Sequence, residues 1–370
     1  MRIRRISVFH RTAPLTRPYK LSGGRLRFEE LDCTFVKVEA DNGLVGWGEG
    51  TPWGHTYLPA HGGGIRAAAE LLAPALLDRD PRQPDRINRL MDLTLPGHLY
   101  AKSPFDIACW DLFGQSVGLP IVDLLGGRHE EPTPIASSIS TDTPDGMLAE
   151  INLYRDMGYY VHSVKVGGSD TDLDIARICH LKANERPGEF IFYDVNRAWT
   201  PAEAITVMNG VADLPVTFEQ PCETLDQCAQ VRALTRQPIS IDERLETEGD
   251  MLRITAGHIG EVVNIKINRV GGLTKARRIR DIGLAGGFKF LVMESGGTVV
   301  ADTQTQHLAQ SIPRDLRLGT WLCQEMLSVD SAPGRGARNN GKGESVAPNL
   351  PGLGVAPDED FLGDPVAVYG

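Results

Sequence analysis

The sequence predicts an α/β protein built on a barrel of alternating strands and helices, preceded by a smaller α+β domain. Three short apolar segments each end in an acid: FIFYD at Asp194, VTFE at Glu219 and ISID at Asp242. The acids follow one another at intervals of about 25 residues, which leaves room for one helix and two loops in each repeat. Because the carboxyl ends of the strands of such a barrel share one mouth, the three carboxylates are expected to converge.

Residues 1–128 are predicted to form the smaller, capping domain. The segments RIRRISVF, TFVKVEA and LVGWGE alternate apolar and polar residues, and Asn42-Gly43 suits a tight turn, so three antiparallel strands are expected. From about residue 64 the pattern is helical, with Ser103-Pro104 as the expected start of the last helix and Gly118 after its end. Two Gly-rich loops, PYKLSGGR (18–25) and TPWGHTYLPAHGGG (51–64), are long for connectors and are predicted to be lids.

Residues 129–330 are predicted to form the barrel, because short apolar runs alternate there with amphipathic stretches. The segment 331–370 is rich in Gly, Pro and Asn and is expected to return across the capping domain. The expected barrel strands are Ile135–Ser138, Val161–Val166, Phe190–Asp194, Val216–Glu219, Ile239–Asp242, Val262–Lys266, Phe290–Glu294 and Leu316–Trp321.

The composition argues against several classes of partner. The 370 residues carry a formal net charge of −10 and the sequence pI is near 5.4, which disfavours nucleic acid or an anionic membrane surface as a partner. The six cysteines lack CxxC spacing, which is typical of reduced thiols. Neither an export signal nor a membrane-spanning run is visible, so the predicted location is the cytoplasm.

Three converging carboxylates need a cation among them, because two like charges ~4 Å apart repel by roughly 4 kcal/mol at an effective dielectric constant of about 20. Oxygen ligands without neighbouring Cys or His suit a hard divalent ion, so Asp194, Glu219 and Asp242 are the predicted ligands of Mg²⁺. The alternative interpretation is that these acids cap the helices that follow them or pair with Arg197 and Arg244.

Two lysines are expected to complete the barrel mouth. Lys165 lies near the end of VHSVKV and Lys266 near the end of VVNIKI, in the second and sixth predicted strands. A single lysine at a strand end usually extends its charged group to solvent or forms an ion pair. These two strands lie on opposite sides of a barrel whose third to fifth strands carry the acids, so a substrate bound at the metal would lie between two amines.

These five residues, with DVNRAW, EQP, IDE and KINRVGGLT around them, resemble the enolase superfamily and its muconate lactonizing enzyme-like branch. The resemblance covers essentially the whole chain and implies a modified (β/α)7β TIM-type barrel, a capping domain, Mg²⁺ and a homo-oligomer. It also implies that Lys266 takes the α-proton from an S-configured carbon while Lys165 serves the opposite face. One departure is that the KxK motif reads Ser163-Val164-Lys165, so the first lysine's supporting role is missing or is taken over by a hydroxyl.

Such enzymes abstract a proton next to a carboxylate, and the divalent ion stabilises the second negative charge that then develops on the carboxyl oxygens. The predicted substrate is therefore a small-molecule carboxylate. Several segments are most similar to those of cis-3-hydroxy-L-proline dehydratases: WGHTYLPAHG, LPGHLYAKSP, SSISTDTPD, EQPCETLDQC, ESGGT and GTWLC. In that substrate the α-hydrogen and the hydroxyl lie on opposite ring faces, so anti elimination needs a base on one side and an acid on the other.

The remaining predicted site residues are substrate contacts and supporting groups. Tyr57 and Trp321 are candidate walls for the ring, since an aromatic face attracts a cation. Glu294 is predicted to pair with the ring ammonium. The predicted supporting residues behind them are Ser163, Asn196 and Glu243.

The main alternative is a 2-epimerase of proline betaine or of its hydroxylated form, which would use the same metal and lysines with aromatic residues around a quaternary nitrogen. LGTWLC contains no DxD pattern, which disfavours a dipeptide epimerase. A non-catalytic binding barrel would be expected to lack at least one of the five central residues, and all five are present. A metal-dependent hydrolase would leave the lysine pair unexplained.

Overall fold

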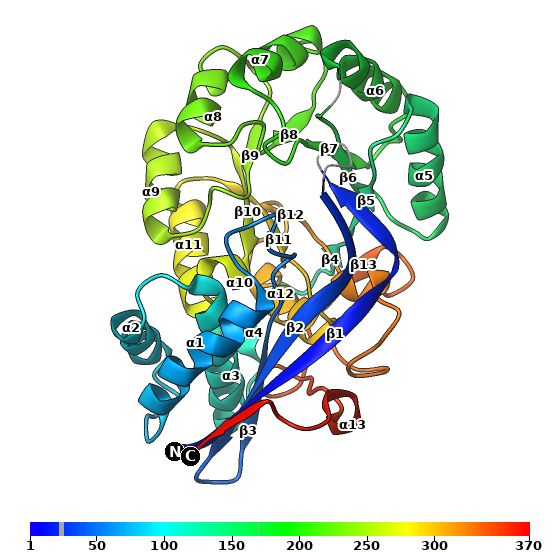
Figure 1. The fold of residues 1–370 in the computed structure, drawn as a ribbon. Coiled ribbons are helices and arrows are strands. Elements are labelled where there is room, and N and C mark those ends of the chain that lie inside the picture. The colour runs from blue at the N-terminus through cyan, green and yellow to red at the C-terminus, as the bar shows by residue number, and fades with distance from the viewer. Residues whose placement is uncertain (22–25, 169) are drawn as a thin grey trace.

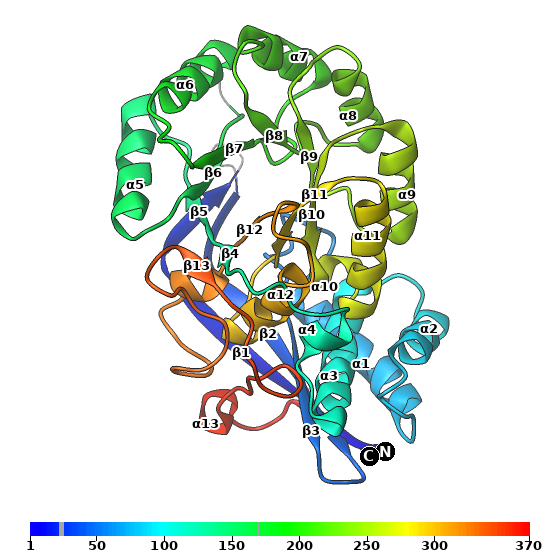
Figure 2. The ribbon, with the colours of Figure 1, turned by 180° about the vertical axis from the view of Figure 1, so that it is seen from behind.

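The computed structural model describes residues 1–21, 26–168 and 170–370. Figure 1 shows a barrel ringed by helices, with a second domain whose two long strands reach from its far end to the barrel. Figure 2 gives the opposite view, in which the C-terminal segment runs across the second domain. Among the described residues, no helix is both long and apolar enough to cross a membrane.

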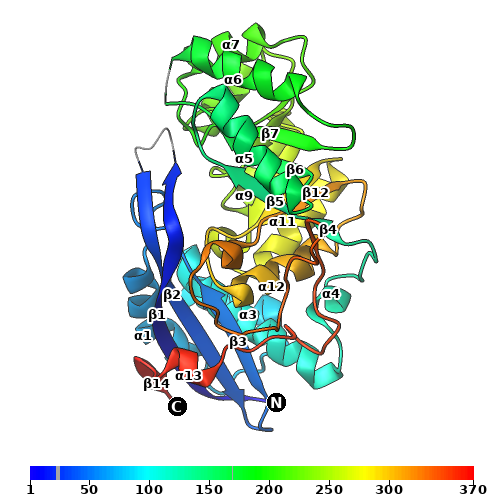
Figure 3. The same ribbon diagram turned by 90° about the vertical axis from the view of Figure 1, so that its right-hand side faces the viewer.

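The capping domain is a four-stranded antiparallel sheet in the order β14-β1-β2-β3, with helices α1 and α3 packed against it. Its outer strand β14 comes from the C-terminus and pairs with β1. In Figure 3 the β1–β2 hairpin stands beside the barrel helices. The elements are β1 (Ile3–Leu21), β2 (Leu26–Ala40), β3 (Val45–Gly50), α1 (Gly62–Leu76), α2 (Pro84–Thr94), α3 (Leu99–Val117), α4 (Ile121–Leu124), α13 (Glu359–Leu362) and β14 (Ala367–Tyr369).

Two predicted boundaries in this domain are wrong. The stretch 18–25 was expected to be a loop, but Tyr19 to Leu21 continue β1 because they pair with Phe28 to Leu26 of β2 across the hairpin; residues 22–25 lie outside the described residues. The last helix begins at Leu99 instead of Ser103-Pro104, and Pro104 lies inside it. Its end is as predicted, with Gly118 in the left-handed conformation at φ 72°.

Glycines let helix α3 pack directly on strand β3. A Cβ atom on Gly46 would lie 2.2 Å from the Ala108 carbonyl oxygen, and one on Gly48 would lie 2.1 Å from the Pro104 carbonyl oxygen. Both distances are far below van der Waals contact with rigid backbone. The GWG sequence of β3 therefore fixes how closely the helix and the sheet approach each other.

The barrel contains eight parallel strands in sequence order from β5 to β12 within the described residues. A parallel bridge between Ile135 and Thr320 links its first and last strands, so the sheet is nearly closed. The eight strand positions agree with the prediction to within two residues at each end. The strands are β5 (Ala136–Ile139), β6 (Val161–Lys165), β7 (Phe190–Asp194), β8 (Thr217–Glu219), β9 (Ile239–Ile241), β10 (Val262–Lys266), β11 (Lys289–Met293) and β12 (Arg317–Thr320).

Helices cover the outside of the barrel between successive strands (Figure 1). After the last strand the chain forms a short 3₁₀ helix, η2 (Cys323–Met326), in place of a full eighth helix. The fold is thus a modified (β/α)7β barrel with an α+β capping domain. The helices are α5 (Pro144–Asp156), α6 (Thr171–Ala183), α7 (Pro201–Gly210), α8 (Leu225–Arg232), α9 (Glu248–Gly257), α10 (Ile267–Val270), α11 (Leu273–Ala285) and α12 (Val299–Ala309), and the short strands β4 (Thr133–Pro134) and β13 (Glu344–Ser345) pair with each other.

Buried carboxylates join the two domains. Glu49 of β3 accepts hydrogen bonds from the Thr298 amide at 2.9 Å and hydroxyl at 2.7 Å. Asp106 of α3 accepts from the Thr274 amide at 2.9 Å and hydroxyl at 2.6 Å, and burial raises the pKa of Asp106 to about 6. The capping domain is therefore held on the barrel by specific polar contacts in addition to apolar packing.

Candidate active site

The strand register places the predicted site residues at one level of the barrel. Lys165 pairs with Asp194 across β6 and β7, and Asp194 pairs with Glu219 across β7 and β8. Asp242 directly follows β9, and Lys266 ends β10. All five residues are at most 8% exposed. The structure thus brings together the five residues that the sequence singled out.

The acids do not cap the helices that follow them, so the structure decides against that alternative. Helices α7, α8 and α9 each begin with a capping box of their own, formed by Thr200 with Glu203, Thr224 with Gln227 and Thr247 with Asp250. The loop arginines are engaged elsewhere, because Arg197 and Arg244 both pair with Glu223. Among the described residues, neither of these two arginines pairs with a strand-end carboxylate.

Lys165 forms an ion pair with Asp194. Asn196 supports the same carboxylate by donating its backbone amide to Oδ1 at 2.9 Å and its side-chain amide to Oδ2 at 3.2 Å. Burial favours the neutral amine, but the Asp194 carboxylate outweighs it and raises the pKa of Lys165 above its ordinary value. In this arrangement Lys165 is a cation.

Lys266 lies 2.6 Å from Asp242 Oδ2, and the buried Arg269 lies 2.6 Å from Asp242 Oδ1. Burial alone would raise the pKa of Asp242, but the charges of Arg269 and Lys266 hold it far below its usual range. Arg269 also donates to the backbone oxygens of Leu245 at 3.0 Å and Asn264 at 2.8 Å. This guanidinium therefore fixes both an acid and the backbone around it.

Glu219 is the acid with an unused oxygen. Its Oε1 accepts from the Asn264 side-chain amide at 2.9 Å, whereas the buried Oε2 has no hydrogen-bond partner within the described residues. Burial, followed by the charges of Asp194 and Asp242, raises the pKa of Glu219 well above its usual range. Both observations fit a divalent cation among these acids, because a cation would satisfy the orphan oxygen and relieve the repulsion.

Across residues 1–21, 26–168 and 170–370, no group of three His, Cys, Asp or Glu side chains already stands in position to hold a metal ion. Asp194 and Asp242 each hold a lysine instead. The donor set still consists of hard oxygen atoms only, which is the chemistry that Mg²⁺ prefers. Asp194, Glu219 and Asp242 thus remain the predicted metal ligands.

Glu243 and Asn196 form hydrogen bonds next to the predicted metal ligand Asp194. The side-chain amide of Asn196 lies 3.2 Å from Glu243 Oε1, and the Tyr57 hydroxyl donates to the same oxygen at 3.0 Å. The backbone at the ends of β7 and β8 adopts positive φ angles at Asn196 (46°), Arg197 (64°) and Gln220 (38°). Such conformations are costly for residues other than glycine, and they concentrate where side chains must be held at functional sites.

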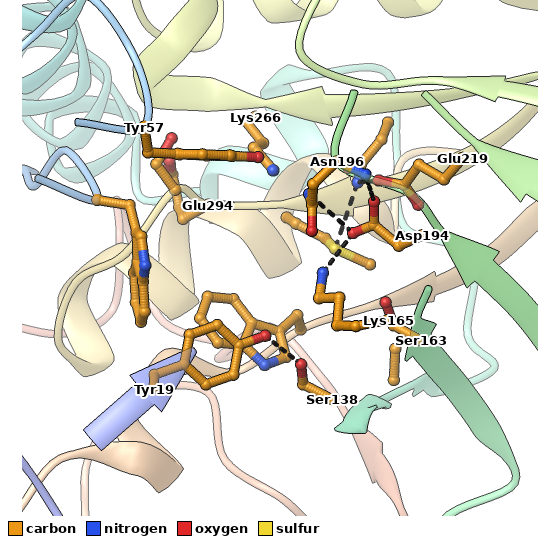
Figure 4. Close-up of a pocket in the computed structure, with 16 residues that line it drawn as sticks. Tyr19, Tyr57, Ser138, Ser163, Lys165, Asp194, Asn196, Glu219, Lys266 and Glu294 are labelled. Atoms are coloured by element: carbon orange, nitrogen blue, oxygen red, sulfur yellow. Dashed lines mark hydrogen bonds and ion pairs between the residues drawn. The ribbon is translucent and has the colours of Figure 1, made fainter. Parts of the chain in front are cut away.

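A pocket opens above these groups (Figure 4). We call one part the Lys266 side, defined by the lining residues Lys266 and Tyr57 together with Asp242 and Arg269, which pair with each other next to Lys266 outside the lining. The other part is the Lys165 side, defined by Lys165, Tyr19, Ser138 and Ser163. The Tyr57 ring centroid lies 5.6 Å from the Lys266 amine. The pocket is lined by Tyr19, Trp53, Tyr57, Ala136, Ser138, Ser163, Lys165, Asp194, Asn196, Glu219, Asn264, Lys266, Met293, Glu294, Ser295 and Trp321.

Glu294 lines the pocket, but both of its carboxyl oxygens have protein partners. Oε1 accepts from the Gln304 side chain at 2.5 Å and Oε2 from the Asn268 amide at 3.0 Å. Burial raises the pKa of Glu294 to about 8, and those hydrogen bonds only partly offset it. At neutral pH this side chain is largely a neutral acid until a cation comes near it.

The aromatic wall of the pocket extends beyond the two predicted rings. Trp321 contacts Trp53 edge to face, with ring centroids 5.7 Å apart, and Tyr19 contacts Trp53 in the same way at 5.2 Å. The sequence indicated Tyr57 and Trp321 but missed Tyr19 and Trp53 as individual contacts, although both lie in the Gly-rich segments 18–25 and 51–64 that were predicted to be lids. It also missed Arg269 as a site residue, although the segment KINRVGGLT, which is one of those that carry the resemblance, contains it.

Two family comparisons match this architecture. Residues 3–126 match the mandelate racemase and muconate lactonizing enzyme N-terminal domain, and residues 146–361 match the enolase C-terminal domain-like family. The chain belongs to the enolase superfamily. Its capping domain and its barrel therefore correspond to the two domains of the mandelate racemase and muconate lactonizing branch.

Individual relatives match most or all of the chain. A cis-3-hydroxy-L-proline dehydratase from Roseibium aggregatum is 37% identical over 370 residues, covering 100% of both chains. An N-succinyl-L-Arg/Lys racemase from Bacillus cereus is 29% identical over 315 residues, 84% of this chain and 85% of the other. A solved enolase superfamily member from Roseovarius nubinhibens ISM, complexed with magnesium, has a TM-score of 0.96 and 52% identity, covering 100% of this chain and 99% of that one.

Proposed function

We propose that this enzyme is a Mg²⁺-dependent dehydratase that converts cis-3-hydroxy-L-proline to Δ1-pyrroline-2-carboxylate. The observation that carries the proposal is a pair of buried lysines, from β6 and β10, on two sides of one pocket lined by carboxylates. The Roseibium relative, similar over its full length, acts on that substrate according to its name. The α-carbon of the substrate, which carries the hydrogen that is removed, would lie between the two amines.

Asp194, Glu219 and Asp242 would hold the metal. Bound there, Mg²⁺ supplies positive charge to the substrate carboxylate and makes the adjacent α-hydrogen more acidic. Asp194 and Asp242, which pair with Lys165 and Lys266, would then bind the metal in place of the two amines. The ion pairs of Lys165 and Lys266 would therefore exchange for substrate contacts when the site is loaded.

The chemistry uses the two lysines in different roles. Lys266 Nζ takes the α-proton, and the electrons of the C–H bond form the double bond to C3. The C3–O bond breaks with its electron pair on oxygen, and Lys165 Nζ donates the proton that lets this oxygen leave as water. The enamine that remains tautomerises to Δ1-pyrroline-2-carboxylate, so the net change is loss of one water molecule.

Glu294 and the aromatic wall are proposed to receive the ring. A secondary ammonium near Glu294 would lower the pKa of that buried carboxyl from about 8 and favour its anion. Tyr57 and Trp321 would pack against the ring methylenes. A charged N–H donor and a buried acid form a stronger pair than an acid and a quaternary nitrogen, which can make no hydrogen bond.

The aromatic rings favour one alternative, a 2-epimerase of proline betaine. Tyr19, Trp53, Tyr57 and Trp321 all line the pocket, and clustered rings suit a quaternary ammonium. Several relatives are named as racemases or epimerases, among them the Bacillus cereus enzyme. An epimerase would use the same lysines and would lose no group from its substrate.

Proton NMR in D2O separates these functions. Enzyme with Mg²⁺ is incubated with cis-3-hydroxy-L-proline, and a parallel sample contains proline betaine; matched samples contain EDTA. Loss of the C3 carbinol signal with appearance of Δ1-pyrroline-2-carboxylate, only with Mg²⁺, is the expected result. Exchange of the betaine α-proton without loss of any group would make the enzyme an epimerase, and no change in either sample would refute both substrates.

A further inference from the structure

The Lys165 side of the pocket holds three hydroxyls to which the chemistry above gives no role. Ser138 of β5 and Ser163 of β6 are direct cross-strand partners, and Ser163 stands two residues before Lys165 on the same face of its strand. Tyr19 comes from β1 of the capping domain, more than a hundred residues away in sequence. Each of the three residues is 8% exposed, and each lines the pocket.

The Tyr19 and Ser138 hydroxyls form a hydrogen bond with each other, which Figure 4 shows at the edge of the pocket next to Lys165. One of the two hydroxyls donates in that bond, so the other retains a free O–H, and both oxygens keep lone pairs. Among the described residues neither hydroxyl has a second side-chain partner. The pair therefore has unused donor and acceptor capacity that faces the cavity.

The position of Tyr19 is fixed by the capping domain. Its ring contacts Trp53 edge to face at 5.2 Å, and Trp53 contacts Phe28 of β2 at 5.6 Å. Tyr19 also pairs with Phe28 across the hairpin. The hydroxyl is thus presented to β5 by a rigid cluster of rings, which is what a group that must meet a substrate atom requires.

We propose that the hydroxyls of Tyr19 and Ser138 bind the C3 oxygen of the substrate and hold it against Lys165 as it leaves. The inference rests on the proposed dehydratase function and specifies which residues select a substrate with a hydroxyl at C3. When the C3–O bond breaks, its electron pair goes to oxygen, Lys165 supplies the proton, and the free O–H of the pair donates a hydrogen bond to the departing water. No other reactant is needed.

The Lys266 side offers a physical contrast. There the groups around the amine are the Asp242 carboxylate, the Arg269 guanidinium and the Tyr57 ring, whose hydroxyl is already given to Glu243. Such surroundings suit proton abstraction next to a carboxylate. Small uncharged donors suit a neutral oxygen that gains charge as it leaves, because their bonds to it strengthen as that charge develops.

The test compares Tyr19→Phe and Ser138→Ala with the wild-type holoenzyme in D2O with Mg²⁺ and cis-3-hydroxy-L-proline. Two rates are measured by NMR: formation of Δ1-pyrroline-2-carboxylate, and appearance of deuterium at the α-carbon of unreacted substrate. Tyr160→Phe is the matched control, since its hydroxyl donates to Glu344 at 2.9 Å and it does not line the pocket.

In Tyr19→Phe, product formation is expected to fall about 10- to 100-fold, as for loss of a hydrogen bond to a charged group. Deuterium incorporation is expected to stay within about threefold of the wild-type rate, because abstraction at Lys266 is unchanged. In Ser138→Ala, product formation should also fall, but by a smaller factor, while deuterium incorporation is retained. Tyr160→Phe should change neither rate.

Three results would overturn the inference. If Tyr19→Phe forms product at the wild-type rate, the hydroxyl pair does not assist the leaving group, and the dehydratase proposal still stands. If both rates fall together, Tyr19 acts on the architecture of the pocket and not on the leaving oxygen. If the wild type incorporates α-deuterium but forms no product, both the leaving-group site and the dehydratase proposal are wrong.

Discussion

The two lysines of the pocket sit in surroundings of different chemistry. On the Lys266 side, the amine, Asp242 and Arg269 form a charged chain that belongs wholly to the barrel. On the Lys165 side, the amine pairs with Asp194, and the nearby hydroxyl pair joins the capping domain to β5. In the proposed mechanism the barrel therefore supplies proton abstraction and charge stabilisation, whereas contacts to the rest of the substrate come partly from the capping domain.

The largest predicted effect concerns Lys266. Lys266→Met removes the proposed base, so both α-proton exchange and product formation should fall by about 10³-fold or more, within the range for loss of a general base. NMR in D2O measures both rates. Lys289→Met, an exposed lysine at the opposite end of the neighbouring strand, is the control and should leave both rates unchanged. If Lys266→Met still exchanges the α-proton, Lys266 is not the base, and the two sides of the pocket do not differ in the way proposed.

Arg269 should matter more for stability than any residue of the Lys165 side. Arg269→Met leaves Asp242 with one cation fewer and two buried carbonyls without their donor, so the free energy of unfolding should fall by roughly 3 to 5 kcal/mol. Urea unfolding measures this change. Arg278→Met removes an arginine that pairs with Asp85 and Glu248 nearer the surface and should cost about 1 kcal/mol or less. Equal losses of unfolding free energy in the two variants would show that the ion pairs among Lys266, Asp242 and Arg269 stabilise the fold no more than a surface pair does.

The raised pKa of Glu294 predicts that the free energy of unfolding depends on pH. Its folded pKa of about 8 lies above the ordinary value of 4.5, so its contribution to stability is complete below about pH 4.5 and is lost as the pH rises through about 8. Between pH 5 and pH 9, wild type should lose roughly 2 to 4 kcal/mol of unfolding free energy relative to Glu294→Gln. Urea titrations at several pH values measure this difference, with the exposed Glu359→Gln as control. Parallel curves for wild type and Glu294→Gln would contradict the raised pKa.

The smallest predicted effect belongs to Tyr57. Tyr57→Phe removes the hydrogen bond to Glu243 but keeps the ring near Lys266, so the enzyme should lose about 1 kcal/mol of stability and retain its KM within about twofold. Tyr57→Leu also removes the ring and should raise KM further. If Tyr57→Phe and Tyr57→Leu raise KM equally, the hydroxyl and not the ring contacts the substrate.

The barrel residues of the site could be predicted because the spacing of the strands and the type of residue at each strand end are both visible in the sequence. Each of Lys165, Asp194, Glu219, Asp242 and Lys266 ends or directly follows a short apolar strand, and the regular alternation of strands and helices places all strand ends at one mouth. The same reasoning recovered the barrel strands to within two residues. Local sequence therefore determines this part of the geometry.

The contribution of Tyr19 from the capping domain could not be predicted in the same way. Tyr19 reaches the pocket only because β1 and β2 continue pairing past the irregularity between Pro14 and Tyr19, and the Gly-rich segment had suggested a loop there. Its partner Ser138 is more than a hundred residues away, and such a contact depends on how two domains pack. Helix α3 likewise began earlier than predicted, since Pro104 is accommodated inside it, where glycines of β3 allow close contact.

The most direct test of the difference between the two sides is the partition of activity in Lys165→Met, measured with Mg²⁺ and cis-3-hydroxy-L-proline in D2O. The predicted result is α-deuterium in recovered substrate at a rate near that of wild type, with product formation reduced at least about 100-fold by loss of a general acid. Equal loss of exchange and product formation, or product formation at the wild-type rate, would contradict the assignment of base to Lys266 and acid to Lys165.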